Sequence, residues 1–229
     1  MDTLKFIFCV SLLLNTYAIS SQTNPINQDL SDIQFATSLN KTIPEAEGSP
    51  YITENFSLVK LVGFDNKVYE GRFNAFNGDM EIKTEGKIIY LNPSNEISVL
   101  FTENNKLYKT YTYNDEDSHS KRGFLLVAKR LSKIELLKLE KIEFFEKKPA
   151  RTSYDKESPA KFKRDADTYY LKTKGKVKKL PTRRKDFIET FPEYESELKK
   201  YIKNNKLNPK NESELVGIIE YLNSLMEKK

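Results

Sequence analysis

The chain has 229 residues, of which 38% are hydrophobic and 31% are charged, and it contains one cysteine and no tryptophan. Its formal net charge of +5 is unevenly distributed: residues 21–120 carry 8 basic and 15 acidic side chains, whereas residues 147–185 alone carry 15 basic and 4 acidic ones. The cysteine, Cys9, lies in a segment that we expect to be removed on export. The mature chain therefore has no thiol, which excludes a cysteine nucleophile, a thiolate metal site and a disulfide.

The first twenty residues predict export. Residues 6–14 form an apolar run of the length found in signal peptides, and Ala18-Ile19-Ser20 supplies the small residues of a cleavage site. The run is shorter than the roughly 20 apolar residues that a membrane-spanning helix needs. We therefore predict a signal peptide over residues 1–20 and a soluble mature chain, without a lipid anchor, that is periplasmic or secreted.

Residues 21–47 have few apolar side chains and no periodicity, so they bury too little surface to offset the entropy of ordering. We predict that they form a disordered leader. From residue 48 the chain changes to short alternating or apolar stretches separated by turn residues, which is typical of antiparallel β-structure. The predicted strands span residues 57–62, 67–73, 80–84, 87–91, 96–102, 106–113, 123–129 and 134–146 (with a break left open), then a pair within 161–173 and a last strand over 176–180.

The alternation and the turns support this interpretation. Ile97, Val99 and Phe101 alternate with polar residues, which predicts a strand with one buried face. Asn77-Gly78 tolerates the positive φ angles of a tight hairpin. About eight to ten short strands are enough for a sandwich or a small barrel, and the sequence does not choose between them.

Beyond Pro181 the apolar period changes from two to about three and a half residues, which indicates helices. Asn211, with Glu214 three residues later, predicts the N-cap and capping box of the last helix. The predicted fold class is α+β: a mainly antiparallel β-sandwich or small barrel over residues 48–180, with two or three helices from residues 181–229 packed on it. The two apolar stripes consist of Phe187, Phe191, Tyr194, Leu198, Tyr201 and Ile202, interrupted at Pro192, and of Leu215, Ile218, Ile219, Leu222, Leu225 and Met226.

Four strings between residues 48 and 225 carry a family resemblance. They are Gly48-Ser49-Pro50-Tyr51, Pro159-Ala160-Lys161-Phe162-Lys163-Arg164, Tyr169-Tyr170-Leu171 and Glu220-Tyr221-Leu222-Asn223-Ser224-Leu225. With these strings the chain resembles a family of exported bacterial proteins, with a β-rich domain and C-terminal helices, that has no assigned function. The resemblance implies export and a bacterial origin. It implies no active site, because none of the strings is a catalytic motif.

Catalytic motifs are scarce. His119 is the only histidine, which excludes multi-histidine metal sites and two-histidine mechanisms. Asp115 and Asp117 beside His119 are candidates to bind a divalent cation, and His119 is a candidate to activate Ser118 or Ser120. The glycine turn and closing glutamate of a calcium loop are missing, so a solvated hairpin loop is favoured. Carboxylate pairs for glycoside hydrolysis stay open, but the absence of tryptophan platforms disfavours them. We expect no enzyme, no catalytic residue, no metal and no cofactor.

The basic segment is the stronger candidate for a functional site. If residues 169–173 and 176–180 pair around Gly175, alternation predicts one largely shared solvent face for Lys172, Lys174, Lys176 and Lys178. Lysines near an anionic membrane contribute about 1 kcal/mol each, and less at high salt. The other interpretation is a lysine-rich edge strand that prevents pairing with other chains. The candidate anion-binding residues are Lys172, Lys174, Lys176, Lys178, Lys179, Arg183, Arg184 and Lys185.

Charge and predicted location together select the partners. Anionic lipid, lipopolysaccharide and acidic polysaccharide fit an exported protein, whereas nucleic acid fits the charge but not the compartment. Residues 161–164 with Tyr169 and Tyr170 interleave aromatic rings with cations, as in single-strand binders, but aromatic residues at strand spacing more often form a core. The acidic half of the chain is a further partner, within the fold or across a homodimer.

We therefore predict an exported, non-enzymatic envelope protein that binds an anionic surface or polymer through the basic segment. The alternative is a protein-protein interaction or assembly module without a small ligand, contacting another envelope protein. The two differ in salt dependence, because only binding to an anion should weaken steeply with salt. The sequence leaves the oligomeric state open. The aromatic face considered for the alternative consists of Phe101, Tyr108, Tyr111 and Tyr113.

Overall fold

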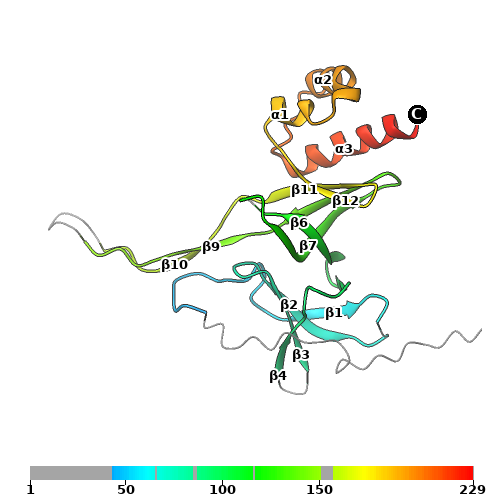
Figure 1. Cartoon of the computed structure of the whole chain (residues 1–229). Helices are drawn as coiled ribbons and strands as arrows, with labels where there is room; N and C mark the ends of the chain where they lie inside the picture. Colours follow the sequence, from blue (N-terminus) through cyan, green and yellow to red (C-terminus); the bar gives the residue numbers. More distant parts are fainter. Residues whose placement is uncertain (1–42, 65, 85–86, 116, 151–156, 229) are drawn as a thin grey trace, which may run out of the picture.

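The computed structural model describes residues 43–64, 66–84, 87–115, 117–150 and 157–228. The predicted signal peptide, and the predicted leader up to residue 42, lie outside the described residues. In the described part, twelve strands precede a C-terminal group of helices (Figure 1). The strands are β1 Ser57–Leu61, β2 Tyr69–Asn74, β3 Asp79–Thr84, β4 Lys87–Tyr90, β5 Ser98–Phe101, β6 Lys106–Asn114, β7 Ser120–Arg130, β8 Ile134–Leu139, β9 Ile142–Phe145, β10 Lys161–Arg164, β11 Thr168–Thr173 and β12 Lys176–Leu180. The helices are α1 Arg184–Glu189, the 3-10 helix η2 Pro192–Tyr194, α2 Glu195–Asn204 and α3 Glu212–Glu227.

Ten of the strands form one antiparallel sheet in the order β12-β11-β8-β7-β6-β5-β1-β2-β3-β4. Strands β4 and β12 are its edges, and β12 curls back close to β6 without joining it in the ladder of the described strands. The sheet is therefore open. The predicted α+β class and antiparallel sheet are confirmed, whereas a sandwich or a barrel is not.

The β1 to β7 part of the sheet curls around the first hydrophobic core. Strand alternation places Val59, Met80, Ile82 and Val99 here, all of them fully buried. Ile97 and Phe101 are also buried in this core, so the alternation predicted for that strand is confirmed. Fully burying side chains of this size contributes about 1.5–3 kcal/mol each. This core therefore holds the N-terminal half of the sheet without the helices.

The helices cover the other end of the sheet and form a second core with β8, β11 and β12 (Figure 1). The apolar stripes predicted for the helices supply its centre, including the buried Phe187, Leu198 and Ile218. The predicted N-cap is confirmed, because the Asn211 side chain accepts a hydrogen bond from the backbone N–H of Glu214. The predicted capping box is not formed, because the backbone N–H of Asn211 donates to the Asn208 carbonyl and the Glu214 carboxylate accepts the backbone N–H of Asn208 (2.6 Å).

The predicted aromatic face does not form one surface. Tyr108 lies in the first core, against Phe101 with ring centroids 5.4 Å apart. Tyr111 and Tyr113 point to the opposite side of β6, where they are buried with Tyr170. Successive odd and even positions of a strand face opposite sides, so Tyr108 cannot share a face with Tyr111 and Tyr113. They are core residues, and the aromatic basis for a protein interface is wrong.

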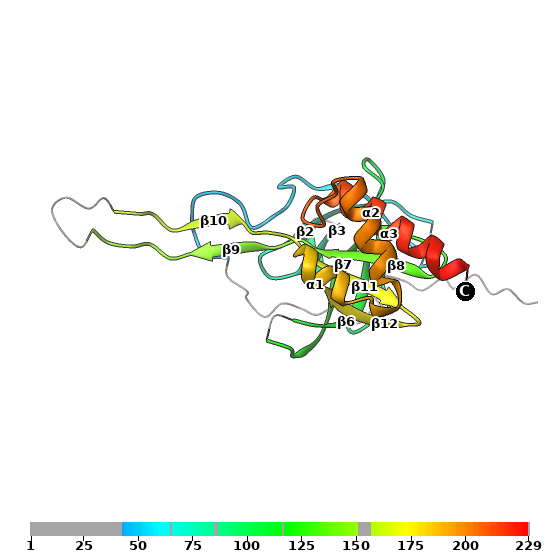
Figure 2. The same ribbon diagram turned by 90° about the horizontal axis from the view of Figure 1, so that it is seen from above.

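Strands β9 and β10 form a separate hairpin that extends away from the body (Figure 2). Its base is held by Ile142 and Phe162, which are buried in the first core. The segment before β1 also binds it, because Glu47 exchanges backbone hydrogen bonds with Ala160 and Phe162 at 2.9 and 2.8 Å. Residues 43–47 are the described part of the predicted leader: Glu47 makes this contact, and Ile43 and Ala46 pack against the first core.

Candidate functional site

The predicted hairpin in the basic segment is present, but its lysines do not share one face. Strands β11 and β12 pair around a two-residue turn, Lys174-Gly175, in which both residues have positive φ (48° and 77°). Thr173 therefore lies opposite Lys176, and even-numbered positions of β11 share a face with odd-numbered positions of β12. Lys172 and Lys176 consequently point to opposite sides of the sheet, which corrects the prediction of a common face.

Lys176 and Lys178 lie on the face that carries the helices, because they pair across the hairpin with Thr173 and Leu171. Lys179 pairs with Tyr170, so it occupies a position of the opposite face, like Lys172. The turn of this hairpin lies beneath the C-terminal end of α3 (Figure 1). Two adjoining hollows of about 540 and 360 Å³ separate the hairpin from α1, η2 and α3. We call this pair of hollows the basic groove; its lysines are Lys133, Lys174, Lys176, Lys178 and Lys179, and its apolar lining comprises Leu171, Leu180, Phe191, Pro192, Tyr194 and Met226.

The charges of the basic groove are not neutralised within the described chain. All five lysines are exposed, and none of them forms an ion pair with a described residue. Glu193 is the one carboxylate that lines the hollows. The four ammonium groups on the helix side, those of Lys133, Lys174, Lys176 and Lys178, outnumber this one carboxylate and create a local positive potential, which a low-dielectric wall strengthens. The C-terminal ends of α1 and α3 contribute at most about half a negative charge each, so the lysines dominate.

The apolar wall of the groove is held in place by packing. Phe191 is buried and contacts Phe187 at a centroid distance of 5.4 Å, whereas Met226 is half-buried. The end of α3 is tied to the β7–β8 turn, because Asn223 Oδ1 accepts the backbone N–H of Lys133 at 3.0 Å. The Ser132 hydroxyl also reaches Asn223. These contacts fix Lys133 beside Met226 at one end of the groove.

The other residues predicted for this site lie elsewhere. The Lys172 ammonium pairs with Glu135 at 3.0 Å and stands 5.3 Å from the centre of the Tyr111 ring. Arg184 donates to the carbonyl of Leu207, and it lines a different hollow, between α1 and α2, together with Lys185. The basic segment therefore divides into three groups rather than one patch. Arg183 is the exposed N-cap position of α1, and Lys185 lies 3.8 Å from Glu189.

Sequence reasoning missed Lys133 and the apolar half of the groove. Lys133 lies about 40 positions before the hairpin, and nothing local marks it. Phe191 and Met226 were recognised only as members of helical stripes. One signal was present, because the interruption at Pro192 in the first stripe marks the turn that brings Phe191 to the hairpin.

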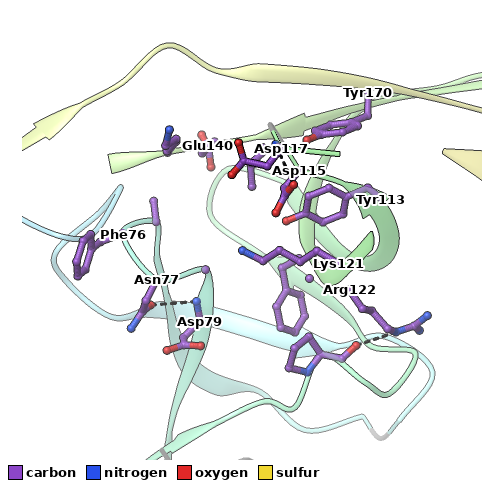
Figure 3. Close-up of a pocket in the computed structure, with 17 residues that line it drawn as sticks. Phe76, Asn77, Asp79, Tyr113, Asp115, Asp117, Lys121, Arg122, Glu140 and Tyr170 are labelled. Carbon is purple, nitrogen blue, oxygen red and sulfur yellow. Dashed lines mark hydrogen bonds between the residues drawn. The ribbon is translucent and has the colours of Figure 1, made fainter. Parts of the chain in front are cut away.

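A further hollow, of about 420 Å³, lies where the β2–β3 turn, the β6–β7 loop and the β8–β9 junction meet. Figure 3 shows Phe76, Asn77 and Asp79 on one side and Tyr113 on the other, with the Lys121 side chain extending between them. We call it the loop cavity. Sequence reasoning did not predict it, because its walls come from segments that are distant in the chain.

The acidic loop beside this cavity has the hairpin-loop structure that the sequence favoured. One oxygen of Asp115, Oδ1, accepts the backbone N–H groups of Asp117 and His119 at 3.0 and 2.9 Å. One ligand atom from each of these three residues lies within 4.8 Å of the others. Asp115 therefore already closes the loop through Oδ1. His119 is 79% exposed on its side chain.

Two buried ionic clusters stabilise the sheet. Glu140 is buried and accepts hydrogen bonds from Tyr108 and Lys106, and burial together with the Glu140 charge raises the pKa of the Tyr108 hydroxyl far above its usual range. Arg72 binds Glu81, which is 1% exposed, at 2.8 Å, and stacks over the Tyr51 ring. Each of these carboxylates is satisfied by partners within the fold, which is what burial of a charge requires.

None of the described helices has the length and apolar content needed to cross a membrane. Comparison with protein-family models, curated proteins and solved structures found no match to this chain. The assignment of a function therefore depends on the geometry of the basic groove and of the loop cavity.

Proposed function

We propose that the chain is an exported, non-enzymatic protein that binds anionic lipid surfaces through the basic groove. The observation that carries the proposal is the convergence of four lysines, unpaired within the described chain, on hollows with an apolar wall; they are Lys133, Lys174, Lys176 and Lys178. An acidic polysaccharide would use the charges but not the wall. An anionic amphiphile uses both, because its headgroup meets ammonium groups and its hydrocarbon meets Phe191 and Met226.

Export is supported by the apolar run of residues 6–14 and the small residues that follow it, as well as by the resemblance to exported bacterial proteins. In such a compartment, phospholipid headgroups and lipopolysaccharide are the available anionic surfaces. The three lysines of the β11–β12 hairpin on the helix side, Lys174, Lys176 and Lys178, at about 1 kcal/mol each near a charged membrane, would together strengthen binding by about two orders of magnitude at low salt.

The test is co-sedimentation of the purified chain with phosphatidylglycerol vesicles, lipopolysaccharide-containing vesicles and neutral phosphatidylcholine vesicles across a salt series. The site variant replaces Lys174, Lys176, Lys178 and Lys179 with Gln. The matched control replaces Lys199, Lys200, Lys203 and Lys210 with Gln, four exposed lysines of α2 and the following loop.

We expect binding to the anionic vesicles only, weakening as salt rises, and lost in the site variant but retained in the control. Equal loss of binding in both variants would show that binding depends only on the net charge of the protein, and would contradict a defined site. Absence of binding with an intact fold would leave β12 as an edge strand protected by lysines.

A further inference from the structure

The loop cavity is lined by a tyrosine hydroxyl for which no hydrogen bond to a described residue is found. Tyr113 is 4% exposed, and its hydroxyl makes no hydrogen bond with any described residue. The hydroxyl points into the cavity (Figure 3). A side chain at position 123 would crowd it, because a Cβ there would lie 3.2 Å from the Tyr113 oxygen. Among the described residues the one buried side-chain polar atom without a partner is Asn74 Nδ2, so the Tyr113 oxygen is open to the cavity and available to a ligand there.

The cavity offers free donors and free acceptors side by side. Burial and the Asp115 charge raise the pKa of Tyr113 to about 12, so its hydroxyl is a neutral donor at neutral pH. The Lys121 ammonium has no ion pair within the described residues and can only donate. Asp117 is exposed, and Asp115 keeps one carboxylate oxygen that no described hydrogen bond uses, so both can accept.

The remaining charged groups of the cavity are engaged elsewhere. Arg122 turns away and donates to the carbonyl of Pro93 at 2.8 Å (Figure 3). Glu140 is occupied by Tyr108 and Lys106. The charges nearly balance, so neither a strongly anionic nor a strongly cationic ligand is favoured by the local potential. The carboxylates are Asp79, Asp115, Asp117 and Glu140, and the cations are Lys121, Arg122 and Lys141.

A fixed aromatic ring completes the cavity. Phe76 is 36% exposed and lies on the side opposite Tyr113 (Figure 3). It is held by an edge contact with Phe162 at 5.2 Å and by Phe144 at 6.2 Å, both measured between ring centroids. Its position is therefore set by the base of the β9–β10 hairpin. The ring offers a rigid apolar surface beside the polar groups.

We propose that the loop cavity binds a neutral saccharide unit. A sugar hydroxyl both donates and accepts, so it can satisfy acceptor-only carboxylates and a donor-only ammonium at once. Asp115 and Asp117 accept from ring hydroxyls, Tyr113 and Lys121 donate to them, and the C–H face of the sugar packs on Phe76. The volume of about 420 Å³ lies within the usual range for small-ligand sites. This inference does not depend on the basic groove.

The test is saturation-transfer NMR on the purified chain with glucose, galactose, N-acetylglucosamine, cellobiose and N,N′-diacetylchitobiose at millimolar concentration. Diglycine serves as a zwitterionic probe. The site variants are Tyr113→Phe, which removes only the unpaired hydroxyl, and Asp117→Asn. The matched control is Glu103→Gln, an exposed carboxylate in the β5–β6 turn.

We expect transfer to at least one saccharide, with affinity about fivefold lower in Tyr113→Phe and about tenfold lower in Asp117→Asn, corresponding to a neutral and a charged hydrogen bond. The Glu103→Gln variant should bind like the wild type. Tyr113→Phe should also leave the unliganded melting temperature unchanged, which separates a binding role from a structural one. Transfer to none of the five saccharides, equal binding by all variants, or transfer to diglycine alone would overturn the proposal.

Discussion

Replacement of Lys172 by Met tests whether this lysine belongs to the fold rather than to the lipid-binding site. Glu135 accepts hydrogen bonds from Lys172, Tyr111 and Arg130 at 2.9 to 3.0 Å, and its side chain is 16% exposed. Loss of one charged partner from a half-buried carboxylate that keeps two others should cost about 1–2 kcal/mol, between the values for exposed and for buried pairs. For a domain of this size that lowers the melting temperature by about 2–8 °C.

The cost should depend on pH. Desolvation would raise the pKa of Glu135, but the hydrogen bonds from Lys172 and Tyr111 and the nearby positive charges lower it overall. A carboxyl whose pKa is lowered by folding contributes stability above its unfolded pKa of about 4.3, and that contribution is lost as pH falls through the folded pKa. The difference between wild type and Lys172→Met should thus be full near neutral pH and should shrink as the pH falls below about 4.3.

Urea unfolding followed by circular dichroism measures this difference, with Lys176→Met as the matched control. Lys176 is exposed on the edge strand, so its replacement should change stability by less than about 0.5 kcal/mol. The two variants should behave in opposite ways, because Lys176→Met weakens vesicle binding and Lys172→Met does not. A Lys172→Met protein of unchanged stability but weaker vesicle binding would refute the assignment.

Two further predictions concern the framework of the sheet. Arg72→Leu should cost about 3–5 kcal/mol in urea unfolding, because it leaves the buried carboxylate of Glu81 without its cation; a loss below about 1 kcal/mol would contradict this. Gly48→Ala should speed amide hydrogen exchange at Glu47 and Phe162, because Gly48 has a φ of +81° and a Cβ there would lie 2.8 Å from the Phe162 carbonyl oxygen. Unaltered exchange at both amides would show that the segment tolerates the side chain.

The strands could be predicted because their information is local. Ile97, Val99 and Phe101 alternate with polar residues, and Gly78 allows the turn between β2 and β3 with a φ of +79°. The start of the last helix at Asn211 could also be predicted from the sequence, since the capping side chain lies within three residues of its partner. The pairing of β1 with β5, in addition to β2, could not be predicted. It joins strands about 40 residues apart in the chain and depends on how the whole sheet curls.

The basic groove was only half predictable for the same reason. Charge counting located the lysines of residues 172–179. It could not show which face of the sheet each lysine occupies. Because the turn has two residues, odd-numbered positions of β11 lie opposite even-numbered positions of β12. The loop cavity was beyond local patterns altogether. The sequence pattern predicts that Tyr113 is an ordinary core residue. Only the structure shows that its hydroxyl has no hydrogen bond to a described residue.

The measurement that tests lipid binding at the basic groove most directly is the fluorescence of a Tyr194→Trp variant, since the chain has no tryptophan of its own. Tyr194 is half-buried in the wall of the groove, and Tyr90→Trp on β4, far along the sheet, is the control. With phosphatidylglycerol vesicles, emission from the Tyr194→Trp variant should shift to the blue, be quenched by brominated acyl chains and return to its original value at high salt, while the control stays constant. A shift in the control alone, or none in either while the vesicles bind the protein, would contradict lipid binding at the basic groove.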